Sequence, residues 1–209
     1  MVVATKLGPR TYADYLAVPE GQRAELIGGE LMMSPQPRGR HILVTSMLGA
    51  RLTTAFGSGV GPTESGPGGW WIFDEPELHL ELDTCVVVPD IAGWRRERMP
   101  EPPTDSHKWT IVPDWVCEVL SPRTQRADRV LKLPFYGRAG VAHVWLVDPV
   151  AETLEVYENR GGAWFLAGAH SEDDVVRAVP FDAVPLALSW LWGRKPPEPA
   201  PATDTASES

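Results

Sequence analysis

Three short runs of this 209-residue chain are apolar almost throughout: 85–88 (CVVV), 115–120 (WVCEVL) and 141–147 (VAHVWLV). Short apolar runs bounded by turn signals are typical of β-strands that are buried on both faces. Such strands need helices on both sides of their sheet. Residues 40–56 carry apolar side chains at helical spacing (Ile42, Leu43, Met47, Leu48, Leu52 and Phe56), and residues 124–139 also predict a helix. The chain is therefore predicted to be an α/β protein with a central mixed β-sheet flanked by helices.

Weaker local signals place the remaining elements. Thr11 is a suitable N-cap for a short helix that ends before Pro19, and Gly28-Gly29 predicts a hairpin within residues 23–33. Pro134 is expected to kink or restart the helix in which it lies. The proline-rich stretch 99–114 is expected to be an irregular loop. Further strands are predicted at 70–73, 77–82, 154–157, 164–166 and 175–179.

The length fits one folded domain, predicted over residues 11–192, with a lead-in at 1–10. Residues 193–209 are rich in proline, alanine, serine, threonine and acidic residues and are expected to be disordered. No apolar run approaches the length of a membrane span, and the N-terminus lacks the apolar stretch of a secretion signal. Cys85 and Cys117 lie inside apolar runs. These features predict reduced, buried cysteines in a cytoplasmic protein without a membrane segment.

The formal net charge of −9 argues against a simple nucleic-acid-binding protein, which usually carries a basic footprint. Two arginine clusters weaken this objection, because each follows an apolar run. Arg95 and Arg96 belong to the first cluster, and Arg123 and Arg126 to the second. These four arginines are candidates for contact with a nucleic-acid backbone, although solvated loop arginines give the same pattern. Trp94, beside the first cluster, is a further candidate for such contact, with core packing as the alternative.

Two acids are out of place among the apolar runs. Glu118 lies inside WVCEVL, on the same strand face as Val116 and Leu120, and Asp90 ends the segment CVVVPD. A carboxylate in a buried strand is costly unless it is paired or bound to a metal. Two carboxylates at adjacent strand ends, completed by waters and a phosphate oxygen, suit octahedral Mg²⁺ or Mn²⁺. Asp90 and Glu118 are therefore predicted as metal ligands.

A basic residue follows on the next helix. Asp128, Lys132 and Tyr136 are spaced i, i+4 and i+8 and form one stripe, which would bring the Lys132 ammonium near a bound phosphate. An exposed Asp128–Lys132 pair of little energetic value is the alternative that spacing leaves open.

Four blocks then resemble one family in the right order. They are AELIGGELMMSPQPRGRH (24–41), EPELHLELD (75–83), PDIAGWRRER (89–98) and PDWVCEVLSPRT with DRVLKLPFYGRAGVAHVWLVDP (113–149). Together they resemble the Uma2 family of putative restriction endonucleases, long catalogued as a domain of unknown function, over about residues 10–190.

The resemblance implies a restriction-endonuclease-like fold of the PD-(D/E)XK nuclease superfamily and phosphodiesterase chemistry. Asp90 matches the first acid of that pattern and Glu118 the second. Leu120 stands where the pattern has its lysine, and the family resemblance moves this role to Lys132. Glu25 matches the acid of the opening segment and is preferred to Glu30. His41 matches a recurring histidine, for which a structural role is equally open.

The sequence thus predicts a Mg²⁺-dependent (or Mn²⁺-dependent) endonuclease that acts on DNA. Asp90, Glu118, Lys132 and Glu25 are its expected catalytic residues, supported by His41, Asp128 and Tyr136. A catalytically idle nuclease-fold binding or scaffold module is the alternative, with homodimerisation as a further expectation. A nuclease for RNA or structured nucleic acid is a third reading.

Overall fold

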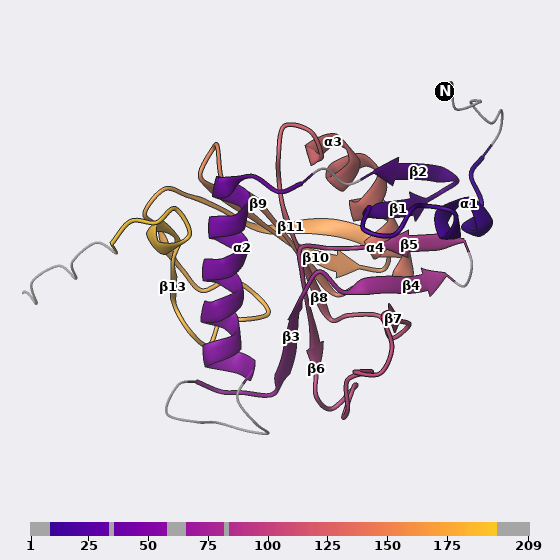
Figure 1. Ribbon diagram of the computed structural model, residues 1–209. Coiled ribbons are helices and arrows are strands. Elements are labelled where there is room, and N and C mark those ends of the chain that lie inside the picture. The colour runs from indigo at the N-terminus through magenta and orange to yellow at the C-terminus, as the bar shows by residue number, and fades with distance from the viewer. Residues whose placement is uncertain (1–8, 34–35, 58–65, 82–83, 196–209) are drawn as a thin grey trace, which may run out of the picture.

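The computed structural model describes residues 9–33, 36–57, 66–81 and 84–195, and its two main sheets meet at one junction (Figure 1). One sheet has six strands in the order β11-β10-β9-β8-β6-β3, and the other has five in the order β2-β1-β5-β4-β7. Within the larger sheet β8 pairs with β9 in parallel, whereas β9 and β10 are antiparallel. The predicted α/β class, with mixed sheets flanked by helices, is therefore confirmed.

The six-stranded sheet contains the central strands that the apolar runs predicted. Its fourth and third strands in space, β8 and β9, coincide with the runs at 115–120 and 141–147. The strands are β3 (Trp70–Asp74), β6 (Ile91–Arg95), β8 (Trp115–Val119), β9 (His143–Asp148), β10 (Thr153–Arg160) and β11 (Ala163–Ser171).

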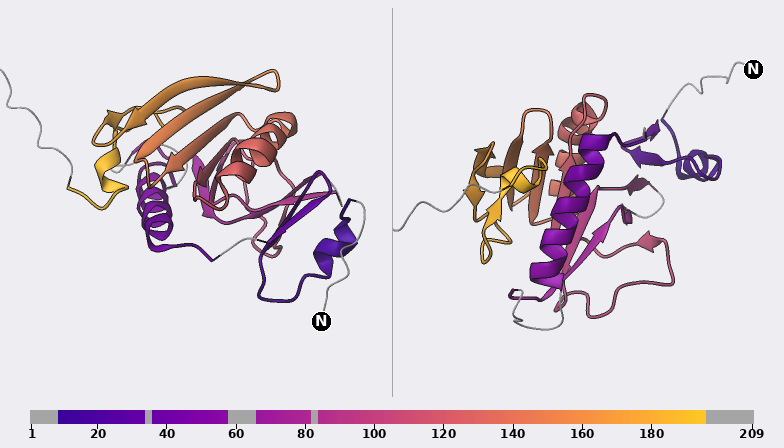
Figure 2. Two further views of the ribbon diagram at one scale, coloured as in Figure 1. Left: turned by 90° about the horizontal axis from the view of Figure 1, so that it is seen from above. Right: turned by 60° about the vertical axis from the view of Figure 1, so that its left-hand side comes forward.

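Helices pack on opposite faces of this sheet (Figure 2). On β8, Cys117 and Val119 belong to the core on the side of α2 (Gly39–Leu52). Val116 belongs to the core on the side of α4 (Leu133–Ala139). Every residue of β8 is consequently buried, which is why its sequence is apolar without alternation.

The five-stranded sheet begins with the predicted N-terminal elements. Thr11 caps α1 (Tyr12–Leu16) in a reciprocal capping box with Asp14. The hairpin turns at Gly28-Gly29, both of which have positive φ. Its strands are β1 (Ala24–Ile27), β2 (Glu30–Met33), β4 (Glu77–Glu81), β5 (Cys85–Val87) and β7 (Lys108–Trp109). Because β5 belongs to this sheet and β6 to the larger one, the chain crosses the junction at residues 88–90.

The helix predicted at 124–139 is present but changes its winding. It consists of α3 (Gln125–Ala127), a π-helical segment η2 (Asp128–Lys132) and α4, with Pro134 in the first turn of α4. The predicted interruption at Pro134 is therefore confirmed. A second π-helical segment, η1 (Thr53–Gly57), continues α2. The remaining elements are β12 (Val175–Val176), β13 (Leu186–Ala187) and the 3₁₀ turn η3 (Leu188–Trp190).

Three local predictions need correction. The apolar pattern gave no strand at 91–95, where β6 lies, and the hairpin β10–β11 is longer than the short strands predicted there. Ile42 and Leu43, assigned to the apolar face of α2, are exposed, and Val44 is buried instead.

Cys85 and Cys117 are free and buried, as predicted. The described part of the chain contains no helix long and apolar enough to cross a membrane. The boundaries at residues 10 and 192 stay predictions, because 1–8 and 196–209 lie outside the described residues.

Candidate active site

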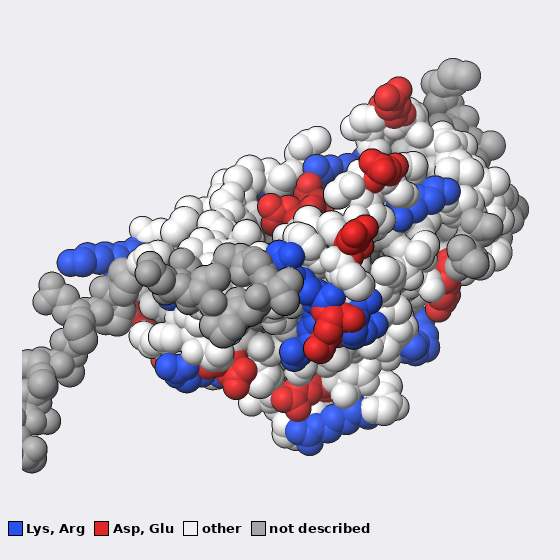
Figure 3. Space-filling view, turned by 90° about the horizontal axis from the view of Figure 1, so that it is seen from below, with Lys and Arg blue, Asp and Glu red and all other residues white. Residues whose placement is uncertain are grey.

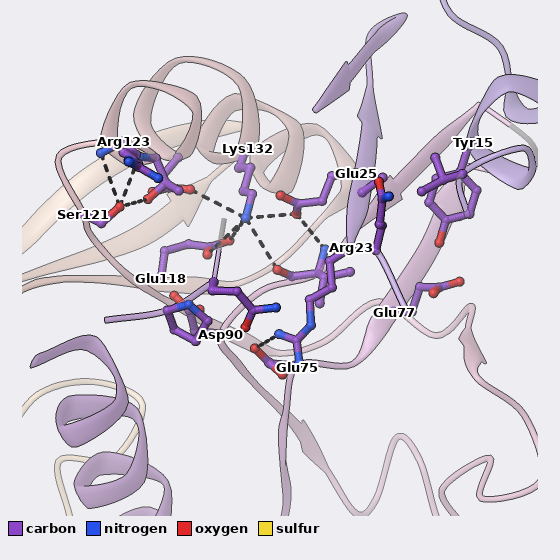
Figure 4. Close-up of a pocket in the computed structure, with 18 of the residues that line it drawn as sticks. Tyr15, Arg23, Glu25, Glu75, Glu77, Asp90, Glu118, Ser121, Arg123 and Lys132 are labelled. Atoms are coloured by element: carbon purple, nitrogen blue, oxygen red, sulfur yellow. Dashed lines mark hydrogen bonds and ion pairs between the residues drawn. The ribbon is translucent and has the colours of Figure 1, made fainter. Parts of the chain in front are cut away.

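A cavity of about 620 Å³ opens at the junction of the two sheets (Figure 4). Its wall is built from α1, the segment that leads into β1, the start of α2, the turn between β3 and β4, the link between β5 and β6, the end of β8, and η2. Glu25, Asp90, Glu118, Asp128 and Lys132 all line it. The structure therefore brings the four predicted catalytic residues into one place.

Lys132 lies at the centre of this group. Its Nζ is 2.9 Å from Glu25 Oε1, 3.3 Å from Glu118 Oε1 and 3.6 Å from Asp128 Oδ1. The side chains of these four residues are between 3% and 7% exposed. Three buried carboxylates thus surround one ammonium, and together they hold the pKa of Lys132 well above its ordinary value although burial acts to lower it. Lys132 is protonated at neutral pH.

Glu118 projects from the middle of the larger sheet toward η2 and α4. The Tyr136 hydroxyl donates a 2.6 Å hydrogen bond to Glu118 Oε1, and Lys132 Nζ lies 3.3 Å from Oε2. Burial raises the pKa of Glu118 well above its ordinary value, and the neighbouring ammonium of Lys132 opposes this only in part. A second cation beside this carboxylate would therefore stabilise its ionised form.

Asp90 is fixed by one backbone and one side-chain partner. Its Oδ2 accepts a 2.6 Å hydrogen bond from the Val119 N–H, and its Oδ1 lies 3.0 Å from His41 Nε2. Burial lowers the pKa of His41, but the hydrogen bond and the charge of Asp90 raise it further, so the net shift is upward. The contact with Val119 places Asp90, in the link between β5 and β6, beside the residue that follows Glu118 on β8, so that both acids reach one cavity.

Asp128 and Lys132 line the cavity, Tyr136 contacts Glu118 through its hydroxyl, and all three residues are buried. The alternative of an exposed Asp128–Lys132 pair is therefore wrong. Burial raises the pKa of Asp128, against the lowering effects of Lys132 and of a hydrogen bond from Thr124.

Glu25 rather than Glu30 contributes to the group. Glu25 lies on β1 and its Oε1 accepts a 2.8 Å hydrogen bond from the Val88 N–H, next to the crossing between the sheets. Glu30 is exposed at the start of β2. Glu25 thus links the smaller sheet to Lys132.

The predicted nucleic-acid-binding arginines do not lie together. Arg123 lines the cavity, whereas Arg126 lies on exposed α3 outside it. Arg95 and Arg96 lie at the end of β6 remote from Asp90, where Arg95 stacks on Trp70 and Arg96 on an adjacent tryptophan. Basic and acidic side chains are interspersed on the face shown in Figure 3.

Trp94, considered as a contact for nucleic acid, is fully buried in the core. Its Nε1 donates to the Ile111 carbonyl at 2.9 Å. That interpretation is wrong, because the aromatic ring completes the apolar core instead of presenting a face to solvent.

Sequence reasoning missed two residues beside the acids. Arg23 and Glu75 form an ion pair at the cavity wall (Figure 4). The position of Arg23, two residues before Glu25, carried a usable signal, because residues i and i+2 of an extended segment share one face. Glu75 begins the family-like block EPELHLELD, but no local pattern indicated its contact with Arg23, which lies 52 residues away in the sequence.

The donor atoms can be compared with the needs of a divalent cation. The described residues contain no group of three or more His, Cys, Asp or Glu side chains placed to hold a metal ion. Mg²⁺, however, is commonly held by one or two carboxylates together with waters and substrate phosphates. Asp90 and Glu118 offer hard oxygen donors of this kind, and the excess of carboxylates over the single buried ammonium of Lys132 favours an added cation. The residues fit a two-carboxylate site.

Comparisons with known proteins agree with this architecture. The model of the Uma2 family, described as "Putative restriction endonuclease", matches residues 12–189. A crystal structure titled as a putative nuclease belonging to DUF820 from Anabaena variabilis shares the fold with a TM-score of 0.68. The two sequences are 24% identical, and the match covers 88% of this chain and 98% of the other. No curated protein matches the chain.

Proposed function

Because the chain belongs to the Uma2 family of putative restriction endonucleases, we propose that it is a divalent-metal-dependent nuclease that hydrolyses phosphodiester bonds, with DNA as its substrate. The observation that carries this proposal is the convergence of Asp90, Glu118, Lys132 and Glu25 in one cavity. Packing of the core does not require charged residues from distant parts of the sequence to meet in one buried site. Binding of a cation beside a phosphate does require this.

The acids Asp90 and Glu118 would hold the metal ion, Mg²⁺ or Mn²⁺. When bound, such an ion polarises the phosphate and lowers the pKa of a bound water. His41 and the Val119 N–H position Asp90, and the Tyr136 hydroxyl positions Glu118.

Lys132 has a different role in the proposed reaction. Its raised pKa keeps Nζ protonated, so it acts by donating hydrogen bonds to the phosphate oxygens as negative charge builds up on them. It does not act as the base that removes a proton from water. Glu25 and Asp128 fix its direction from two sides.

The test is cleavage of labelled single-stranded DNA, duplex DNA and RNA with Mg²⁺ or Mn²⁺. Asp90→Asn and Glu118→Gln preserve side-chain size and are expected to lower the cleavage rate by roughly a hundredfold or more, with an unchanged circular dichroism spectrum. Glu158→Gln changes an acid outside the cavity and serves as the matched control. Cleavage by both cavity variants at the parental rate would contradict the proposal, and preference for RNA would contradict only its DNA part.

The arrangement of Lys132 also favours a second candidate, a catalytically idle scaffold with a nuclease fold. Its ammonium pairs with Glu25, Glu118 and Asp128 and compensates part of their negative charge. Calorimetric titration with Mn²⁺ separates the two. The nuclease requires binding that is lost in Glu118→Gln, whereas the scaffold predicts no binding or binding indifferent to that change. Homodimerisation and a cytoplasmic location stay predictions, and sedimentation equilibrium would test the first.

A further inference from the structure

The cavity is lined by both buried and exposed charged residues. Its floor is formed by the buried carboxylates around Lys132. Its more exposed lining, the mouth, carries three arginines, Arg23, Arg38 and Arg123, together with the acids Glu20, Glu75 and Glu77. We call the three arginines the arginine rim. They come from the segment before β1, the N-cap of α2 and the loop between β8 and α3, so three separate parts of the chain place a guanidinium at one opening.

Arg23 is the rim residue nearest in sequence to the floor. It precedes Glu25 by two residues and its guanidinium pairs with Glu75, which also lines the cavity. The two side chains are 54% and 37% exposed, and exposed pairs of this kind contribute only about 0–1 kcal/mol. An incoming anion can therefore replace Glu75 as the partner of Arg23 at little cost.

Glu75 is held where it is by an unusual backbone conformation. Its φ is +49°, in the left-handed region that non-glycine residues rarely adopt, and its N–H donates a 3.1 Å hydrogen bond to the Asp90 carbonyl. Such strain tends to be retained at functional sites. The pair with Glu75 therefore holds the Arg23 guanidinium at the mouth of the cavity, beside the backbone of Asp90.

The guanidiniums of the other two rim arginines are available to bind an anion. Within the ranges that the structure describes, neither Arg38 nor Arg123 forms an ion pair or a side-chain hydrogen bond through its guanidinium. A guanidinium presents a fork of donors that matches a phosphate, and a nucleic-acid strand carries one phosphate per nucleotide. Three arginines around one opening can therefore contact more than one phosphate of a strand.

We propose that the arginine rim binds the backbone phosphates that flank the scissile one, and that Glu75 holds Arg23 in place until a phosphate displaces it. This inference rests on the proposed nuclease function, since it assumes a nucleic-acid ligand. The ligand is then a nucleic-acid backbone, a polyanion that the rim recognises by its charge and not by its base sequence.

The test measures binding without cleavage, by fluorescence anisotropy of a labelled 20-nucleotide DNA, single-stranded and duplex, in EDTA from 20 to 300 mM salt. One phosphate contact contributes a slope of about 0.9 for duplex and about 0.7 for single strands in log K against log salt. Arg23→Ala is expected to reduce the slope by that amount and to weaken binding about fivefold to eightfold at 100 mM salt. Arg160→Ala removes an exposed, acid-paired arginine outside the cavity and should change neither quantity.

Glu75→Gln provides the opposite perturbation. It is expected to tighten binding, and this gain should shrink in the Arg23→Ala background, because Glu75 acts through Arg23. An unchanged salt slope in Arg23→Ala, or no binding by the parent at 20 mM salt, would overturn the rim. DNA binding without any metal-dependent cleavage would still support phosphate binding by the arginine rim and would contradict only the proposed nuclease function.

Discussion

Replacing Lys132 by methionine tests whether its ammonium neutralises the buried acids. Methionine retains the apolar stem, so the change removes the charge and leaves little cavity. Three carboxylates within 2.9–3.6 Å, all at most 7% exposed, then lose their shared cation. Breaking a buried ion pair by removing one partner costs about 3–5 kcal/mol. For a chain of this size that corresponds to a fall in melting temperature of roughly 6–20 °C.

Urea unfolding followed by tryptophan fluorescence measures this loss as a shift in midpoint at constant m-value. Arg129→Met is the matched control, because Arg129 lies in the same helical segment and pairs with Glu155 at 2.9 Å, but both side chains are partly exposed to solvent. This solvent-accessible pair should contribute at most about 1 kcal/mol. A Lys132→Met variant that loses no more stability than the control would refute the charge-compensation argument.

Magnesium gives the same variant a second measurement. If the acids bind divalent cations, Mg²⁺ at a hundred times its dissociation constant should restore about 2.7 kcal/mol to Lys132→Met, whereas NaCl of equal ionic strength should not. Equal effects of the two salts would argue against a metal site at these carboxylates.

Three further predictions concern stability. Tyr136→Phe removes the 2.6 Å hydrogen bond to buried Glu118 and should cost about 1–3 kcal/mol in urea unfolding. Gly93→Ala would place a Cβ 3.1–3.3 Å from an isoleucine and two tryptophan side chains, so a loss of about 1–3 kcal/mol is expected by calorimetry. Burial lowers the pKa of His143, opposed in part by Glu158, so its contribution to stability is present above pH 6.5 and is lost as pH falls. His143→Gln should therefore flatten the dependence of unfolding free energy between pH 7 and pH 5.

The sequence was most informative where one physical requirement acted alone. Continuous apolar runs identified β8 and β9, because strands covered on both faces tolerate few polar residues. The cost of a buried charge singled out Glu118, and helical spacing placed Lys132 near it. Both inferences depend on residues close in sequence.

The missed features depend on packing between distant segments. Strand β6 escaped prediction because Gly93 interrupts the apolar pattern, and the glycine is needed where the rings of Trp70 and Trp115 close over the strand. Arg95 and Arg96 were predicted, like Arg123, to contact a nucleic-acid backbone, but β6 carries them away from the cavity. A strand that begins beside the cavity carries the residues at its other end away from it.

The net charge of −9 and a nucleic-acid substrate are compatible because the two act over different distances. Exposed charges beyond about 10 Å are largely screened at 0.1 M salt, so binding is decided by the groups at the mouth of the cavity. There the arginine rim would face the backbone in the proposed complex, while the acids of the floor are buried and partly compensated by Lys132. The same acids supply the negative charge that a divalent cation needs. An acidic floor beneath a basic rim thus favours a cation and a polyanion in one cavity, which neither a uniformly acidic nor a uniformly basic surface could do.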